Sequence, residues 1–150
     1  MLSELTVKEF LKAAASSTPI PGGGSAAALA AALAAGLSEM VAGLTVGRKG
    51  FEEFEEEMTE IAASAATFRD RCSENIDRDA EAYNQVIAAF RMPKDNDEEK
   101  KARSEAIQIA LKHAALVPLE TARLAFQIVE LAGKVVQNGN PNAVTDGVVA

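Results

Sequence analysis

The sequence has few residues of the kinds that build disulfides, zinc sites and nucleic-acid surfaces. Its 150 residues include one cysteine, one histidine, one tyrosine and no tryptophan. A lone cysteine excludes a disulfide within the chain and fits a reducing cytoplasm. No Cys/His cluster has the spacing of a structural zinc site, so we expect no bound metal. The formal net charge of −7 argues against nucleic acid as a partner, because no basic stripe is present to neutralise phosphates.

The sequence also has little that would direct it to a membrane. Its first residues do not combine a basic segment with an apolar one, so no signal peptide is predicted. The apolar stretch 26–46 consists mainly of alanine and is interrupted by Ser38 and Glu39. We interpret this stretch as a buried helix rather than a membrane span. The expected location is the cytoplasm.

Strand patterns are almost absent, whereas helix signals recur along the whole chain. Thr6 and Glu9 form a capping box for a short first helix. An alanine-rich helix follows over about 26–45, apolar around its whole circumference, with Ser25 as its N-cap. Residues 51–92 contain neither glycine nor proline, and their apolar residues recur at spacings of three and four. This pattern predicts one long helix.

Breaks in the remaining sequence divide it into further helices. Asp97 is expected to cap the next helix, and Pro118 to break or kink it. Asn138-Gly139 is expected to end that stretch, and one more helix begins near Asn140. We therefore predict a single all-α domain over residues 1–150, a helical bundle with a central alanine-rich helix and one long helix. A forty-residue helix is about 60 Å long, too long for a compact monomer of this size, so the helix must bend, break or pack on a second subunit. Of these, we expect a dimer or higher oligomer.

The most distinctive motif lies directly before the alanine-rich helix and reads Pro19-Ile20-Pro21-Gly22-Gly23-Gly24-Ser25. Glycines permit positive φ angles and let the backbone approach a ligand. The helix start that follows offers free N–H groups, which favour an anion. A plain tight turn is the alternative. The motif matches neither a dinucleotide fingerprint nor a phosphate loop, so nucleotide binding is not implied.

Candidate chemical groups occur at three further places. Arg48 and Lys49 form either a clamp for a substrate carboxylate or a solvated loop. Asp79 is a polar residue on the long helix and is a candidate acid or base, whereas Asp77 points to another face and is expected to be solvated. Tyr83, one turn further, either hydrogen-bonds in the same place as Asp79 or is a core aromatic residue.

The third place is a polar cluster near the C-terminus of the sequence. Asn140, Asn142 and Asp146 either recognise the polar edge of a heterocycle or simply begin a helix. The lone His113 is interpreted as a surface residue. Cys72 falls on an apolar stripe and is interpreted as a core residue.

Taken in order, these motifs resemble the formiminotransferase-cyclodeaminase C-terminal domain and its stand-alone relatives. The resemblance covers nearly the whole chain and rests on five segments: Thr18–Ser25, Leu44–Lys49, Asp79–Tyr83, Val117-Pro118 and Gly139–Asp146. Members of this family are all-helical dimers or higher oligomers that act on one-carbon adducts of tetrahydrofolate. The resemblance implies closure of 5-formimidoyltetrahydrofolate to 5,10-methenyltetrahydrofolate with loss of ammonia. The alternative is hydrolysis of the methenyl ring to 10-formyltetrahydrofolate.

The resemblance also implies roles for individual residues. The expected acid/base is Asp79 or Asp146, and no permanently bound cofactor is expected. The expected substrate-binding residues are Pro21, Gly22, Gly23, Gly24, Ser25, Arg48, Lys49, Tyr83, Asn140 and Asn142. Family members continue past the position of Ala150 with at least one more helix, which implies truncation here. The alternatives to an enzyme are a non-catalytic oligomeric scaffold and a folate-binding remnant, but a scaffold has no need of a glycine loop and a cationic turn.

Overall fold

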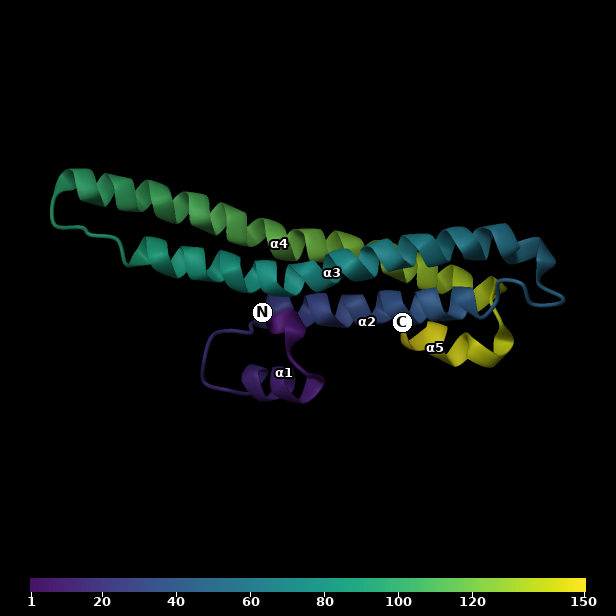
Figure 1. The fold of residues 1–150 in the computed structure, drawn as a ribbon. Coiled ribbons are helices and arrows are strands. Elements are labelled where there is room, and N and C mark those ends of the chain that lie inside the picture. Colours follow the sequence, from purple (N-terminus) through teal and green to yellow (C-terminus); the bar gives the residue numbers. More distant parts are fainter. The chain divides into compact units, whose positions relative to one another are not determined.

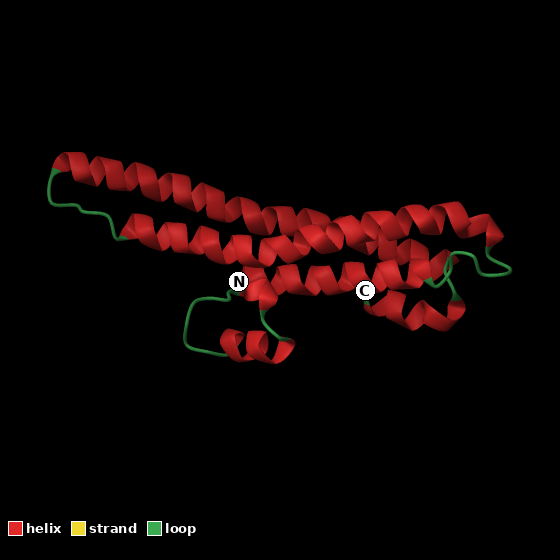
Figure 2. Ribbon diagram, viewed as in Figure 1, coloured by secondary structure: helices red, strands yellow, loops and turns green.

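The computed structural model describes residues 1–150 as helices and connecting loops without a strand (Figure 2). The predicted all-α class is therefore confirmed. Figure 1 labels the five α-helices along the chain. Their bounds are α1 (Val7–Ala14), α2 (Gly23–Gly43), α3 (Glu55–Phe90), α4 (Asp97–Asn138) and α5 (Val144–Val149), and short 3-10 helices cover Leu2–Glu4 (η1), Glu52–Phe54 (η2) and Pro141–Ala143 (η3).

Internal contacts divide the chain into two compact units. The first unit consists of Met1–Ala27 and Glu74–Thr121, and the second of Ala28–Ser73 and Ala122–Ala150. Each of α2, α3 and α4 contributes residues to both units. The single domain over residues 1–150 stays a prediction.

In the first unit, residues 74–90 of α3 and 97–121 of α4 run side by side and are joined by the turn 91–96 (Figure 1). Small side chains let these two helices pack closely, since Val86, Ala89 and Ala110 form a buried cluster. Asn96, rather than the predicted Asp97, caps α4, because its Oδ1 accepts from the Glu99 N–H. The helix therefore begins one residue earlier than predicted.

Pro118 does not end α4, which continues as one helix of 42 residues. Of the break or kink that was predicted at Pro118, the break is wrong, and the structure has a second long helix in addition to α3. A proline inside a helix cannot donate to the carbonyl four residues earlier, here that of Ala114. Packing of the surrounding apolar face outweighs this loss, since Val117 is 2% exposed and Leu124 is 3% exposed.

The N-terminal segment belongs to the first unit and is fixed by two polar arrangements. The predicted capping box is confirmed: Thr6 Oγ1 accepts from the Glu9 N–H, and Glu9 Oε2 accepts from the Thr6 N–H at 2.9 Å. Asp77 accepts from the backbone N–H groups of Leu2 and Ser3. Asp77 is therefore not the solvated residue that was predicted but holds η1 against α3.

In the second unit, the remaining parts of α2, α3 and α4 bury two apolar clusters. Among the apolar residues of α3 that recur at spacings of three and four, Met58, Ile61, Ala65 and Cys72 are buried, each at most 3% exposed. One cluster contains Ala31, Ala32, Ala35, Cys72, Leu124 and Ile128, and the other contains Val41, Ala42, Met58, Ile61, Val135 and Ala143. Alanines on α2 allow close helix packing around larger residues of α3 and α4.

α2 is less buried than its sequence predicts. Its side chains include Leu33 at 63% exposed and Met40 at 41% exposed. α2 is long and apolar enough to cross a membrane by length and composition alone. Core helices of soluble proteins meet the same two criteria, so these criteria are weak evidence for a membrane span. The apolar circumference of α2 therefore leaves one face uncovered in this chain.

Candidate functional site

The first unit contains a carboxylate fixed at the start of a helix. Ser25 is the third residue of α2, so its N–H is one of the four that lack a partner within the helix. Asp79 on α3 supplies that partner: its Oδ2 accepts from the Ser25 N–H at 2.8 Å and from the Ser25 hydroxyl at 3.1 Å. Ser25 is therefore not the predicted N-cap, because a carboxylate from another helix takes that role.

This arrangement changes the interpretation of the three glycines. None of Gly22, Gly23 and Gly24 has a positive φ; the two glycines that do are Gly47 and Gly50. A Cβ atom at Gly24 would lie 2.0 Å from Asp79 Oδ1, whereas one at Gly23 would meet nothing within 4 Å. Gly24 is required because the Asp79 carboxylate lies directly against the backbone. The predicted anion at this helix start is thus an internal side chain.

A cavity of about 270 Å³ adjoins the fixed carboxylate. It is slightly smaller than the usual range for ligand pockets, which starts at about 300 Å³. The lining residues are Pro19, Ile20, Gly22, Gly23, Asp79, Ala80, Tyr83 and Ala114. The structure therefore brings part of the glycine loop together with Asp79 and Tyr83 around one cavity.

Three predicted loop residues do not line this cavity. Pro21 is buried, Gly24 lies against Asp79, and Ser25 is 0% exposed. Four residues that line the cavity were not predicted as site residues from the sequence. Ala80 is signalled by its place between Asp79 and Tyr83 on one helix, and Pro19 and Ile20 belong to the motif itself. Ala114 carries no such signal, because only the packing of α4 on α3 brings it there.

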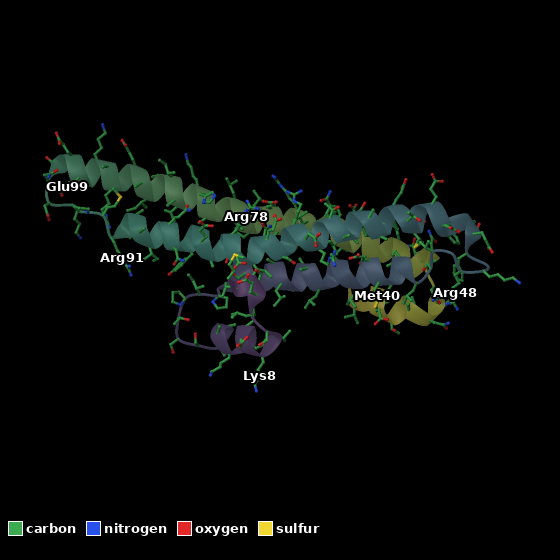
Figure 3. All side chains as sticks on the ribbon, in the orientation of Figure 1. Lys8, Met40, Arg48, Arg78, Arg91 and Glu99 are labelled. Atoms are coloured by element: carbon green, nitrogen blue, oxygen red, sulfur yellow. The ribbon has the colours of Figure 1, made fainter.

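The other predicted residues belong to the second unit. Arg48 lies in the loop after α2 (Figure 3), and both Arg48 and Lys49 are exposed. The Arg48 guanidinium carbon lies 6.0 Å from the centre of the Phe51 ring, within the range of a cation–π contact. Both carboxylate oxygens of Glu52 accept from the Gly50 N–H, which lowers the pKa of Glu52 and fixes the turn.

Asn140 joins this turn to the C-terminal segment. Its N–H donates to Thr45 Oγ1 at 2.9 Å, its Nδ2 donates to the Leu44 carbonyl at 3.3 Å, and its Oδ1 accepts from the Asn142 N–H at 3.0 Å. Asn140 is 4% exposed. Its amide therefore serves the fold, and it brings the loop of Arg48 and Lys49 near η3 and α5.

The two remaining predicted residues lie beyond Asn140. Asn142 is exposed, and the half-buried Asp146 lies in the first turn of α5. No hydrogen bond orients the Asp146 carboxylate, in contrast to that of Asp79. His113 is exposed beside Gln85, and Cys72 is buried, both as interpreted from the sequence. No group of three or more histidine, cysteine, aspartate or glutamate side chains is arranged to hold a metal ion.

Comparison with known proteins identifies the family of this all-helical chain. Residues 6–150 match the formiminotransferase-cyclodeaminase family, and the chain belongs to this family. A crystal structure of formiminotetrahydrofolate cyclodeaminase from Thermotoga maritima superposes with a TM-score of 0.84 and 32% identity. That similarity covers 99% of this chain and 70% of the Thermotoga chain.

Two curated relatives carry different activities in their names. The methenyltetrahydrofolate cyclohydrolase of Methylorubrum extorquens is 40% identical over 150 residues, which is all of this chain and 72% of that protein. The formimidoyltransferase-cyclodeaminase of Rattus norvegicus is 31% identical over 149 residues. This chain spans only 28% of the length of the rat protein.

Proposed function

We propose that this protein is an enzyme that acts on the one-carbon unit carried between N5 and N10 of tetrahydrofolate. The principal reaction is that of a formimidoyltetrahydrofolate cyclodeaminase. Family membership and the names of the relatives give the substrate class. The observation that carries the mechanism is Asp79, whose Oδ2 is held by Ser25 while the side chain lines a cavity.

Ring closure needs one proton to move between two nitrogens. N10 attacks the amidinium carbon, which gives a tetrahedral carbon bonded to N5, N10 and an amino group. The proton on N10 must then pass to the amino group, so that the C–N bond breaks and ammonia leaves. A carboxylate that accepts the first proton and returns it to the leaving nitrogen is a suitable group for this transfer, with a rate effect of about 10²–10⁴-fold. We assign this role to Asp79.

The second candidate is the cyclohydrolase reaction, favoured by the 40% identity to the Methylorubrum protein. Here water attacks the methenyl carbon, and the same tetrahedral carbon carries a hydroxyl in place of the amino group. Asp79 accepts the proton of the attacking water and returns it to N5 as the C–N5 bond breaks, and the remaining hydroxyl proton passes to solvent as the formyl C=O forms on N10. The two reactions differ only in the nucleophile and the leaving group, so one positioned carboxylate serves either.

The remaining predicted residues keep supporting roles in this proposal. The Tyr83 hydroxyl and the backbone at Gly22 and Gly23 contact the folate in the first unit, which is consistent with their place around the cavity. Arg48 and Lys49, which belong to the second unit, are candidate ligands for carboxylates through their exposed cationic groups. Asn142 contributes polar contacts, and Asp146 is the second candidate for the acid/base.

We also propose that the enzyme is a cytoplasmic homo-oligomer without a permanently bound cofactor. The support for oligomers is the uncovered apolar surface of α2 and α4, where Leu33 is 63% exposed and Phe126 is 65% exposed. Large exposed apolar patches are typical of protein interfaces. Light scattering coupled to gel filtration measures the subunit number directly. A monomer at micromolar concentration contradicts this part of the proposal.

The function is tested by the near-ultraviolet absorbance of the methenyl bridge. Growth of this absorbance from 5-formimidoyltetrahydrofolate, with release of one ammonia per bridge, is the result expected for the cyclodeaminase. Loss of absorbance from added 5,10-methenyltetrahydrofolate, faster than in buffer, is expected for the cyclohydrolase. Absence of both activities contradicts the proposal and favours a scaffold.

A further inference from the structure

Ser25 makes contacts that do not fit a residue which binds substrate. Its side chain is 0% exposed, and the hydroxyl lies 2.9 Å from the Ile76 carbonyl and 3.1 Å from Asp79 Oδ2. The Ser25 N–H donates to the same Asp79 oxygen at 2.8 Å. The N–H and the hydroxyl of this serine therefore both contact α3, and both meet one oxygen of the Asp79 carboxylate.

The backbone at Gly24 restricts the second oxygen of the same carboxylate. A Cβ at this position would lie 2.0 Å from Asp79 Oδ1 and 2.4 Å from Cγ. The carboxylate therefore rests on bare backbone, with Oδ2 bound to Ser25 and Oδ1 beside Gly24. The bonds from Ser25 to Oδ2 and the close backbone at Gly24 together restrict the orientation of this carboxylate.

We propose that Ser25 is a positioning residue, which holds the Asp79 carboxylate so that one defined oxygen is available for proton transfer at the cavity. This inference rests on the proposed function and adds a role for a residue that does not touch the substrate. A fixed orientation matters because a displacement of about 1 Å at a reacting group can cost about 10²-fold in rate. The single hydroxyl proton is shared between Asp79 Oδ2 and the Ile76 carbonyl, and both acceptors lie on α3, so the serine also ties α2 to α3 at this point.

The test compares Ser25→Ala with a matched substitution on the same helix. Ser38 is also 0% exposed, but its hydroxyl has no hydrogen-bond partner. We expect Ser25→Ala to lower kcat about tenfold, the effect of losing one hydrogen bond to a charged group. KM should stay within about twofold of wild type, because the serine does not contact the folate. Ser38→Ala should retain the wild-type kcat and KM.

The outcomes separate this inference from the proposed function. A raised KM with unchanged kcat in Ser25→Ala overturns the positioning role and makes Ser25 a binding residue. A lower melting temperature with unchanged kcat also overturns it, because Ser25 is then purely structural. If Asp79→Asn retains the wild-type kcat, the role of Asp79 in the proposed function has failed, and the positioning role fails with it. A loss of kcat in both Asp79→Asn and Ser25→Ala supports both.

Discussion

Replacement of Gly24 by alanine is the sharpest perturbation that the structure offers. The added Cβ would lie 2.0 Å from Asp79 Oδ1, whereas ordinary contacts begin at 3.4 Å, so the carboxylate must move by about 1.4 Å (3.4 − 2.0). A shift of that size also breaks the 2.8 Å bond from the Ser25 N–H. We expect kcat to fall about 10²-fold, the typical cost of misplacing a reacting group by about 1 Å.

The same substitution has a smaller effect on stability. Loss of the bonds to an ionised carboxylate costs about 1.5–3 kcal/mol, and alanine in place of glycine in a helix returns about 0.5–1 kcal/mol. The free energy of unfolding in urea should therefore fall by about 0.5–2.5 kcal/mol. That leaves a folded protein on which the methenyl absorbance assay gives a meaningful kcat.

Gly43→Ala is the matched control for this experiment. Gly43 lies on the same helix, outside the candidate site, and an added Cβ there would meet nothing within 4 Å. Wild-type kcat is expected for Gly43→Ala. The reasoning is refuted if folded Gly24→Ala turns over substrate as fast as wild type, because Asp79 then either tolerates the displacement or takes no part in the reaction.

Three further predictions concern other parts of the chain. Asn75→Ala should lower the free energy of unfolding, measured in urea, by about 2–3 kcal/mol, because this 0% exposed amide donates a hydrogen bond to Thr121 Oγ1. An unchanged free energy of unfolding would contradict a stabilising role for this hydrogen bond. Thr6→Ala should raise the NMR titration midpoint of Glu9, since the Thr6 hydroxyl is the main cause of its lowered pKa. Because folding lowers the pKa of Glu9, its ionised side chain stabilises the folded protein at pH values above its pKa in the unfolded state. This stabilisation is lost as the pH falls through the pKa of Glu9 in the folded state. Lys49→Ala should raise KM about fivefold at constant kcat. The same substitution should leave KM unchanged for a folate analogue without the glutamate tail.

Helix positions were predictable where the local sequence alone determines them. The capping box of Thr6 and Glu9 needs only residues three apart, and the long helix needs only the absence of glycine and proline over 51–92. The helix break predicted at Pro118 does not occur, because the local cost of the proline is outweighed by the burial of Val117 and Leu124 along the helix.

The candidate site was only partly predictable for a similar reason. The glycine loop, Asp79 and Tyr83 stand out as residue types, and they adjoin one cavity. The role of Ser25 was not predictable, because its partners Ile76 and Asp79 are more than fifty residues away in the sequence. From the local sequence a serine after three glycines is an N-cap; only the packing of α3 shows that the capping group is Asp79.

Asn140 shows the same limit in the second unit. The residues around Asn140 are compatible with both a helix start and a binding group. Its hydrogen bonds with Leu44 and Thr45, which lie about 95 residues earlier in the sequence, show that its amide has a structural role. A sequence pattern shows that an amide is present but not which of its hydrogen bonds are already used. Arg48 and Lys49, by contrast, remain exposed in their loop as candidate carboxylate ligands.

The most direct test of the account is the kcat of Asp79→Asn in the methenyl absorbance assay. Asparagine keeps an oxygen that can accept from the Ser25 N–H, so the fold at the start of α2 is preserved, but it cannot carry the proton between the two nitrogens. We predict a loss of about 10²-fold or more in kcat, with a circular dichroism spectrum like that of wild type. Wild-type turnover by folded Asp79→Asn would contradict the central claim and leave Asp146 as the residue to test.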